Sequence, residues 1–147
     1  MFDIVVITAA NAAQANGYRE QVNWRRKRGM LPESLEVLVV SDPGGRRVGS
    51  LGATVNVLKK LKDANGKRVF ICHSGGDARR TPGYAAMGKA FTPMPMDGGI
   101  AMFDLILATR TPPFFGILNL PMFARMRSNI AMPPSIGIGV NALPIAA

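Results

Sequence analysis

The sequence contains a single cysteine, Cys72, so no disulfide can form within the chain. We therefore expect a reducing, cytoplasmic setting. No run of about 18 apolar residues is present, which argues against a membrane-spanning helix and a membrane partner. The opening segment MFDIVVITAAN carries Asp3 and no basic lead-in, a composition that does not fit a secretory signal peptide.

Acidic residues are few and unevenly placed. The 147-residue chain has 9 Asp and Glu against 18 Lys and Arg, a formal net charge of +9, and no acid follows Asp104. Such a balance suggests a polyanionic partner, namely nucleic acid, an anionic membrane or phosphorylated small molecules. Residues 111–147 are also broken by prolines. We therefore divide the chain into a domain at 1–110 and an irregular tail at 111–147.

Short apolar runs rich in β-branched residues alternate with helical patterns. The runs DIVVITAA, LEVLVVSDP and RVFICHS predict three buried strands. Helices are expected at 12–28, at 48–66 and at 99–110. Asn11 can cap the first of them, and Leu51, Val55, Leu58 and Leu61 share one face of the second. This alternation predicts an α/β fold with a Rossmann-like parallel sheet and flanking helices.

The stretch SGGDARRTPGYAAMGK, residues 74–89, places two glycines, two arginines and a lysine directly after the third strand. Ligands of parallel sheets bind past the carboxyl ends of the strands. Glycines leave backbone N–H groups open to a ligand, while arginine and lysine supply charge-assisted bonds to phosphate oxygens. We therefore predict that this segment binds the phosphates of a nucleotide. The alternative is a surface turn with solvated arginines, and the P-loop pattern G-x-x-x-x-G-K-[ST] is absent.

The longer stretch HSGGDARRTPGYAAMGKAFTPMP resembles the signature of the sugar-phosphate nucleotidyltransferases. Together with VVITAANAAQANGYREQV, SDPGGRRVGSLGATVNVL and FDLILA, it resembles the N-terminal guanylyltransferase region of the bifunctional L-fucokinase/GDP-fucose pyrophosphorylases, over about residues 3 to 108. The resemblance implies a nucleotidyltransferase-type domain that uses GTP and fucose-1-phosphate, with a divalent cation such as Mg²⁺, to make GDP-fucose and pyrophosphate. A fragment of an enzyme known as L-fucokinase is the second enzymatic interpretation, although no kinase site is visible.

The resemblance also implies roles for the matched positions. Arg80 would contact the triphosphate and stabilise the transition state, and Lys89 would contact a phosphate of the nucleotide or the sugar. The nucleotide- and phosphate-binding positions would be Ser74, Gly75, Gly76 and Asp77 in the loop, and Gly49, Ser50, Gly52 and Thr54 in a second glycine-rich wall. In that wall Leu51 replaces a glycine of the family, and its side chain could block a ligand or pack inward.

Other polar residues leave alternatives open. Asp77 could help to place a metal or cap a helix, and Asp42 could be a turn residue or a ligand contact. We expect Cys72 in the core, whereas His73 borders the glycine loop and is open to substrate contact. No set of metal ligands is visible, so the metal ligands are unknown.

The basic run WRRKR, with residues 25–28 beside Trp24, supports a rival function, a basic nucleic-acid-binding module. A solvated helix end is the favoured interpretation, because cations are stabilised at a helix C-terminus. We therefore expect no nucleic-acid partner.

The family pattern continues past FDLIL with a strand that carries a metal-binding aspartate, which no residue after Asp104 can supply. The tail at 111–147 is either divergent or, as we favour, the product of a reading frame shifted near residue 110. A parallel sheet without its later strands exposes an apolar edge. We therefore expect marginal stability or self-association, with little or no transferase activity. A non-catalytic nucleotide-binding remnant is a further interpretation.

Overall fold

The structure is a computed structural model that describes residues 2–61, 64–76, 82–84, 88–95 and 99–110. Arg80, Asp77 and the tail at 111–147 lie outside the described residues. The strands and helices are β1 (Ile4–Ala9), α1 (Ala12–Lys27), β2 (Glu36–Ser41), α2 (Gly49–Lys60), β3 (Val69–His73) and α3 (Met102–Arg110). Three short 3₁₀ turns complete the order, namely η1 (Pro43–Gly45), η2 (Pro82–Tyr84) and η3 (Lys89–Phe91). Each predicted strand and helix is present.

The three strands form one parallel sheet in the order β2-β1-β3. Ile4 pairs with Glu36 on one side and with Val69 on the other, which sets the register of both ladders. All six residues of the central strand β1 are buried, as expected for a parallel strand covered on both faces. The predicted Rossmann-like α/β fold is confirmed.

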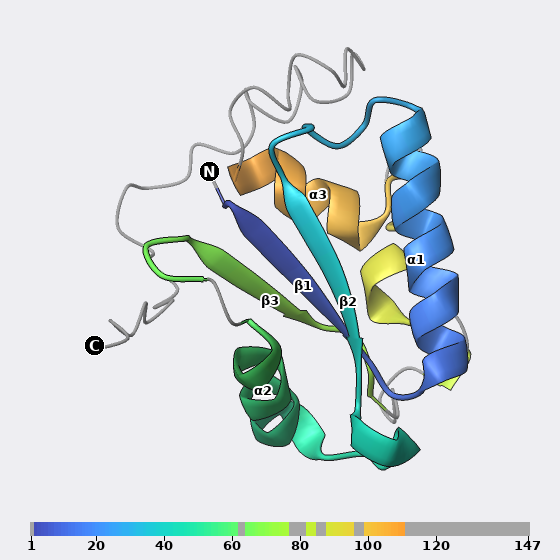
Figure 1. The fold of residues 1–147 in the computed structure, drawn as a ribbon. Helices are drawn as coiled ribbons and strands as arrows, with labels where there is room; N and C mark the ends of the chain where they lie inside the picture. Colours follow the sequence, from blue (N-terminus) through green and yellow to red (C-terminus); the bar gives the residue numbers. More distant parts are fainter. Residues whose placement is uncertain (1, 62–63, 77–81, 85–87, 96–98, 111–147) are drawn as a thin grey trace, which may run out of the picture.

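Helices cover both faces of the sheet, with α1 and α3 on one side and α2 on the other (Figure 1). Successive residues of β1 point to opposite faces, so Val5 and Ile7 join the core under α1 and α3, whereas Ile4 and Val6 join the core under α2. Among the described residues, no helix has the length and apolar character that a membrane crossing requires.

The face of α2 that packs on the sheet carries Ala53 and Val57, which are buried. Leu51, Val55 and Leu58 instead lie on the outer side, with exposed fractions of 78%, 43% and 50%. The alternative that Leu51 packs inward is therefore wrong. Small and β-branched residues at positions 53 and 57 make the contact with the strands, and the larger leucines remain at the surface.

The first turn of α1 is held by a reciprocal pair of side-chain bonds. Asn11 Oδ1 accepts from the backbone N–H of Gln14 at 2.9 Å, and Gln14 Oε1 accepts from the backbone N–H of Ala10 at 2.8 Å. This arrangement follows the logic of a capping box. It confirms the predicted N-cap and fixes the point where the chain leaves β1.

The end of α1 is joined to α3 by a buried ion pair. Arg25 Nε donates to Asp104 Oδ1 at 2.6 Å and its NH2 group donates to Oδ2 at 2.8 Å. Arg25 and Asp104 are only 5% and 4% exposed. The prediction of a solvated helix end is therefore wrong for Arg25. Its side of α1 faces the first turn of α3, where Asp104 supplies the opposite charge.

We expect Asp104→Asn to lower the free energy of unfolding by about 3–5 kcal/mol, because it leaves a guanidinium buried without its counter-charge. Denaturant titration of the full chain measures this loss. The control is Glu36→Gln, which removes a half-exposed pair with Lys67 at 3.9 Å and should cost less than about 1 kcal/mol. Equal effects of the two substitutions would contradict a structural role for the buried pair.

Candidate active site

The carboxyl ends of the three strands meet at one edge of the sheet, where Ala9 pairs with Ser41 and Thr8 pairs with His73. The chain leaves this edge from β1 into α1, from β2 into η1 and from β3 into the glycine turn at residues 75 and 76. Because α2 runs back along the sheet, its N-terminal residue Gly49 belongs to the same end of the fold. The sheet therefore collects both glycine-rich segments at the edge where parallel sheets bind ligands.

Ser74, the first residue after β3, is 2% exposed and uses its hydroxyl inside the protein. The Oγ atom lies 2.9 Å from the Tyr18 hydroxyl and accepts from the backbone N–H of Ala90 at 3.0 Å. Burial raises the pKa of Tyr18 above its ordinary value, so its phenol stays protonated at neutral pH. The sequence predicted a phosphate contact for Ser74, and the structure gives its hydroxyl two protein partners.

The two glycines of the turn occupy different surroundings. A Cβ atom at position 75 would overlap the backbone nitrogen of Ala10 and lie 2.8 Å from the Ala9 Cα atom. Gly75 thus lets the chain cross closely over the end of β1. A Cβ atom at position 76 would meet no described atom within 4 Å. Of the two, Gly76 is the one whose surroundings leave space for a ligand.

Lys89 begins η3 and its side chain is exposed. The preceding residue, Gly88, has a φ of 73°, and a Cβ atom there would collide with the Tyr18 hydroxyl. Phe91, two residues later, packs against Tyr18 and Phe103 with ring centroids 5.4 and 5.2 Å apart. The backbone around Lys89 is therefore held by α1 and α3, while the residue itself is exposed.

The predicted second wall is helical from its first residue. Gly49, with a φ of 69°, starts α2, and the other three predicted positions, Ser50, Gly52 and Thr54, follow within that helix. Thr54 Oγ1 donates to the Ser50 carbonyl oxygen at 2.9 Å and lies 3.2 Å from His73 Nε2. The helix therefore brings Thr54 to the end of β3.

Asp42 follows β2 and is 6% exposed. Its backbone N–H donates to the Ala9 carbonyl oxygen at 2.9 Å, so Asp42 is a structural residue of the turn that follows β2. Its carboxylate forms no hydrogen bond or ion pair with another described residue, so a ligand role stays a prediction. The described residues also contain no group of three or more His, Cys, Asp or Glu side chains that could hold a metal ion.

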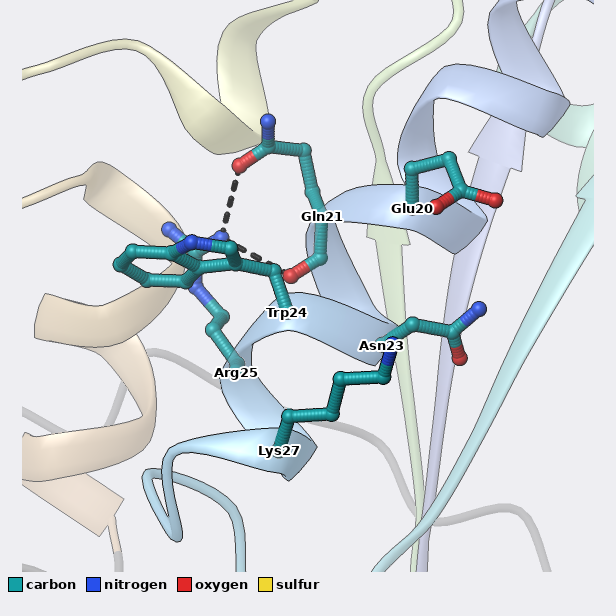
Figure 2. Close-up of a pocket in the computed structure, with 6 residues that line it drawn as sticks. All are labelled: Glu20, Gln21, Asn23, Trp24, Arg25 and Lys27. Atoms are coloured by element: carbon teal, nitrogen blue, oxygen red, sulfur yellow. Dashed lines mark hydrogen bonds between the residues drawn. The ribbon is translucent and has the colours of Figure 1, made fainter.

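A cavity of about 440 Å³ lies on the second half of α1. Figure 2 shows the residues that line it, which are Glu20, Gln21, Asn23, Trp24, Arg25 and Lys27. Since α1 starts at the carboxyl edge of the sheet, the residues in its second half lie toward the opposite edge, where the strands begin. The cavity is therefore separate from the glycine turn.

Most of the basic run at residues 25–28 is already used within the protein. Arg25 is buried against Asp104, and Arg26 NH2 donates to the Leu35 carbonyl oxygen at 2.9 Å. The Arg28 guanidinium lies 3.9 Å from the centroid of the Trp24 ring, a cation–π contact. Within the described part of the chain, Arg25 is the member of this run whose charge is paired with an acid, and Lys27 contacts neither an acid nor an aromatic ring.

Sequence reasoning missed the residues that hold the site together. Tyr18 lies in the buried row Ala15, Tyr18, Val22 and Arg25 of α1, at the three- and four-residue spacing that marks an apolar helical face. That spacing predicts burial of Tyr18. It does not reveal the pairing with Ser74, 56 residues away in the sequence.

The chain is similar in sequence to known fucose-1-phosphate guanylyltransferases. It is 36% identical over 113 residues to the fucose-1-phosphate guanylyltransferase of Homo sapiens, a match that covers 73% of this chain and 19% of the human protein. It is 33% identical over 139 residues to the bifunctional fucokinase/GDP-fucose pyrophosphorylase of Arabidopsis thaliana, covering 73% of this chain and 13% of that protein. The chain thus spans less than a fifth of these relatives.

A third relative is the L-fucokinase/L-fucose-1-P guanylyltransferase of Bacteroides fragilis, 33% identical over 95 residues, 54% of this chain and 10% of that protein. No protein-family model matches the chain, and no solved structure matches it. The resemblance to this family that the sequence motifs predicted is confirmed.

We expect Gly75→Ala to cost about 1–3 kcal/mol of folding free energy, because the added methyl group meets the backbone of Ala9 and Ala10. Gly76→Ala is the matched control and should leave stability nearly unchanged, since its methyl group meets no described atom. Thermal or denaturant unfolding of both variants measures the difference. A Gly75→Ala variant as stable as the wild type would contradict the tight crossing over β1.

Burial raises the pKa of Cys72 to about 11. We therefore expect its reaction with a thiol-specific disulfide reagent at pH 8 to be roughly a hundredfold slower in the folded chain than in denaturant, because the thiolate is the reactive form. The neutral thiol is favoured by folding, so its contribution to stability is present below pH 9 and is lost as the pH rises through 11. Comparison with Cys72→Ala isolates that contribution; equal folded and unfolded reaction rates would contradict the raised pKa.

Proposed function

Because the chain is homologous to one stretch of the fucose-1-phosphate guanylyltransferases, we propose that it binds GTP at the carboxyl edge of its sheet as the nucleotide-binding part of a nucleotidyltransferase. The observation that carries this proposal is the 36% identity over 113 residues to the human protein of that name. The gathering of both glycine-rich segments at one sheet edge supports it, since that edge is where such folds bind ligands.

The proposed reaction is a substitution at phosphorus. A phosphate oxygen of fucose-1-phosphate attacks the α-phosphorus of GTP, the bond to the oxygen bridging the α- and β-phosphates breaks, and pyrophosphate leaves with the electron pair. No protein nucleophile is required, so the residues act by position and charge. In this proposal the turn at Gly76 lets the backbone approach the phosphates, while Lys89 and Arg80 meet their negative charge. The N-terminus of α2 at Gly49 adds partial positive charge at the same end of the fold.

The proposal includes a divalent cation, Mg²⁺, for which the described residues offer no complete ligand set. Mg²⁺ is commonly held by substrate phosphates and waters with only one or two protein carboxylates. We therefore propose that it reaches this chain as the Mg²⁺ complex of GTP. The proposed roles of the protein residues do not depend on a preformed metal site.

The rival function, binding of nucleic acid through residues 25–28, has less support. Three of these four cations already contact Asp104, the Leu35 carbonyl oxygen or the Trp24 ring. Neutralising Arg25 would also break a buried ion pair, so a loss of nucleic-acid binding could then result from a loss of folding. The clean test is Lys27→Gln with Arg28→Gln, and loss of salt-sensitive duplex binding in that variant would favour the rival.

We expect the full chain to bind Mg²⁺–GTP saturably in a calorimetric titration. Arg80→Ala should raise the dissociation constant by about tenfold or more, because a charge-assisted contact to phosphate is lost. The matched control is Arg68→Ala. Arg68 pairs with Asp3 at the amino end of β3, so its loss should leave GTP affinity unchanged.

The same preparation should release pyrophosphate from GTP and fucose-1-phosphate at a rate near background, because no acidic residue follows Asp104 to supply the metal-binding aspartate that the family resemblance implies. Turnover well above background would refute this expected low activity. Absence of GTP binding by the folded wild-type chain would refute the proposed function itself.

A further inference from the structure

We propose that Ser74 is a positioning residue, whose hydroxyl sets the place of Lys89 relative to the glycine turn at residues 75 and 76. The inference rests on the proposed function, because these two segments would together form the phosphate site. It goes beyond that function by assigning the geometry of the site to a buried pair, Ser74 and Tyr18, that need not touch a ligand.

Ser74 joins two segments that are distant in the sequence. It directly precedes the glycine turn, and its Oγ atom accepts from the backbone N–H of Ala90, the residue after Lys89 and 16 positions further along the chain. Ser74 and Ala90 are 2% and 1% exposed. Water cannot replace a bond at that depth without cost, so one side-chain oxygen ties the lysine segment to the end of β3.

Tyr18 completes this connection from α1. If Ser74 Oγ–H donates to the Tyr18 hydroxyl at 2.9 Å, the Tyr18 O–H can donate to the Ser74 carbonyl oxygen at 3.4 Å. Ala90 N–H then donates to Ser74 Oγ, and each of the three donors has an acceptor. Tyr18 therefore helps to hold the Ser74 hydroxyl in place beside the backbone N–H of Ala90.

The residue before Lys89 is restrained as well. Gly88 lies against the Tyr18 hydroxyl with a φ of 73°. A side chain there would collide with that hydroxyl, and residues other than glycine rarely adopt this φ. Thr92 Oγ1 donates to the Gly88 carbonyl oxygen at 3.1 Å. The backbone is thus fixed on both sides of Lys89, whose own side chain is exposed.

This arrangement matters for binding because lysine is a long, flexible side chain that acts as a point charge. Its effect on a phosphate depends on where its backbone holds it relative to the glycine amides. Displacements of about 1 Å in a positioned group can cost large factors in binding or rate. Loss of the Ser74 hydroxyl should therefore weaken the phosphate site even though Gly76 and Lys89 are intact.

The test uses the purified full chain with inorganic tripolyphosphate as the probe. Lys89 is labelled by reductive methylation with and without the probe, and mass spectrometry reports its protection; a parallel titration gives the dissociation constant. We expect Ser74→Ala to abolish the protection of Lys89 and to raise the dissociation constant by about tenfold. Tyr18→Phe should give a smaller increase, because Ala90 keeps its acceptor.

The control for general loss of stability is Val6→Ala, in the core on the opposite face of the sheet. All variants are compared in conditions where circular dichroism shows them folded. A merely structural role predicts that Ser74→Ala and Val6→Ala both keep the wild-type affinity and the protection of Lys89. That result would overturn the inference and leave the proposed function intact.

Two other outcomes are also decisive. If the folded wild-type chain shows no protection of Lys89, the proposed function fails at this lysine and the positioning role falls with it. If Ser74→Ala does not fold, Tyr18→Phe decides, and an unchanged dissociation constant in that variant would overturn the inference.

Discussion

The buried ion pair between Arg25 and Asp104 is the constraint on which this side of the fold depends. It joins the end of α1 to the first turn of α3, with both charges almost fully removed from solvent. Burial of two charges is costly unless each finds its partner with good geometry, and here two hydrogen bonds satisfy the pair. The Arg25 guanidinium also lies 4.8 Å from the centroid of the Phe91 ring. The pair therefore also contacts the 3₁₀ turn that begins at Lys89, through Phe91.

The candidate phosphate site is built on this packed layer rather than on a free loop. Phe91 fills the space between α1 and α3, and Tyr18 reaches from α1 to Ser74 at the end of β3. The glycine turn and Lys89 are thus parts of one hydrogen-bonded unit. In the proposed site the cations would supply the charge, and the buried neutral residues Ser74 and Tyr18 would set its place.

The two basic regions of the sequence have different structural roles. Residues 25–28 are rich in charge, yet Arg25 is a core residue and Arg28 covers the exposed Trp24 ring. Lys89 forms no ion pair with the other described residues and is exposed. A count of positive charges does not show which cations are exposed, because Arg25 is buried in an ion pair whereas Lys89 lies at the surface. The proposed GTP site includes Lys89 and does not include residues 25–28.

The sequence by itself determined the order of strands and helices, the parallel sheet and the N-cap at Asn11, because these follow from local patterns of apolar and capping residues. Motif spacing also identified the family to which the chain is related. It did not predict that Leu51 would be exposed, that Arg25 would be buried or that Gly75 serves a crossing over β1. Those properties depend on which residues meet across the fold, as Tyr18 meets Ser74 and Arg25 meets Asp104. Only the tertiary structure decided them, because contacts between distant segments leave no periodic signal in the chain.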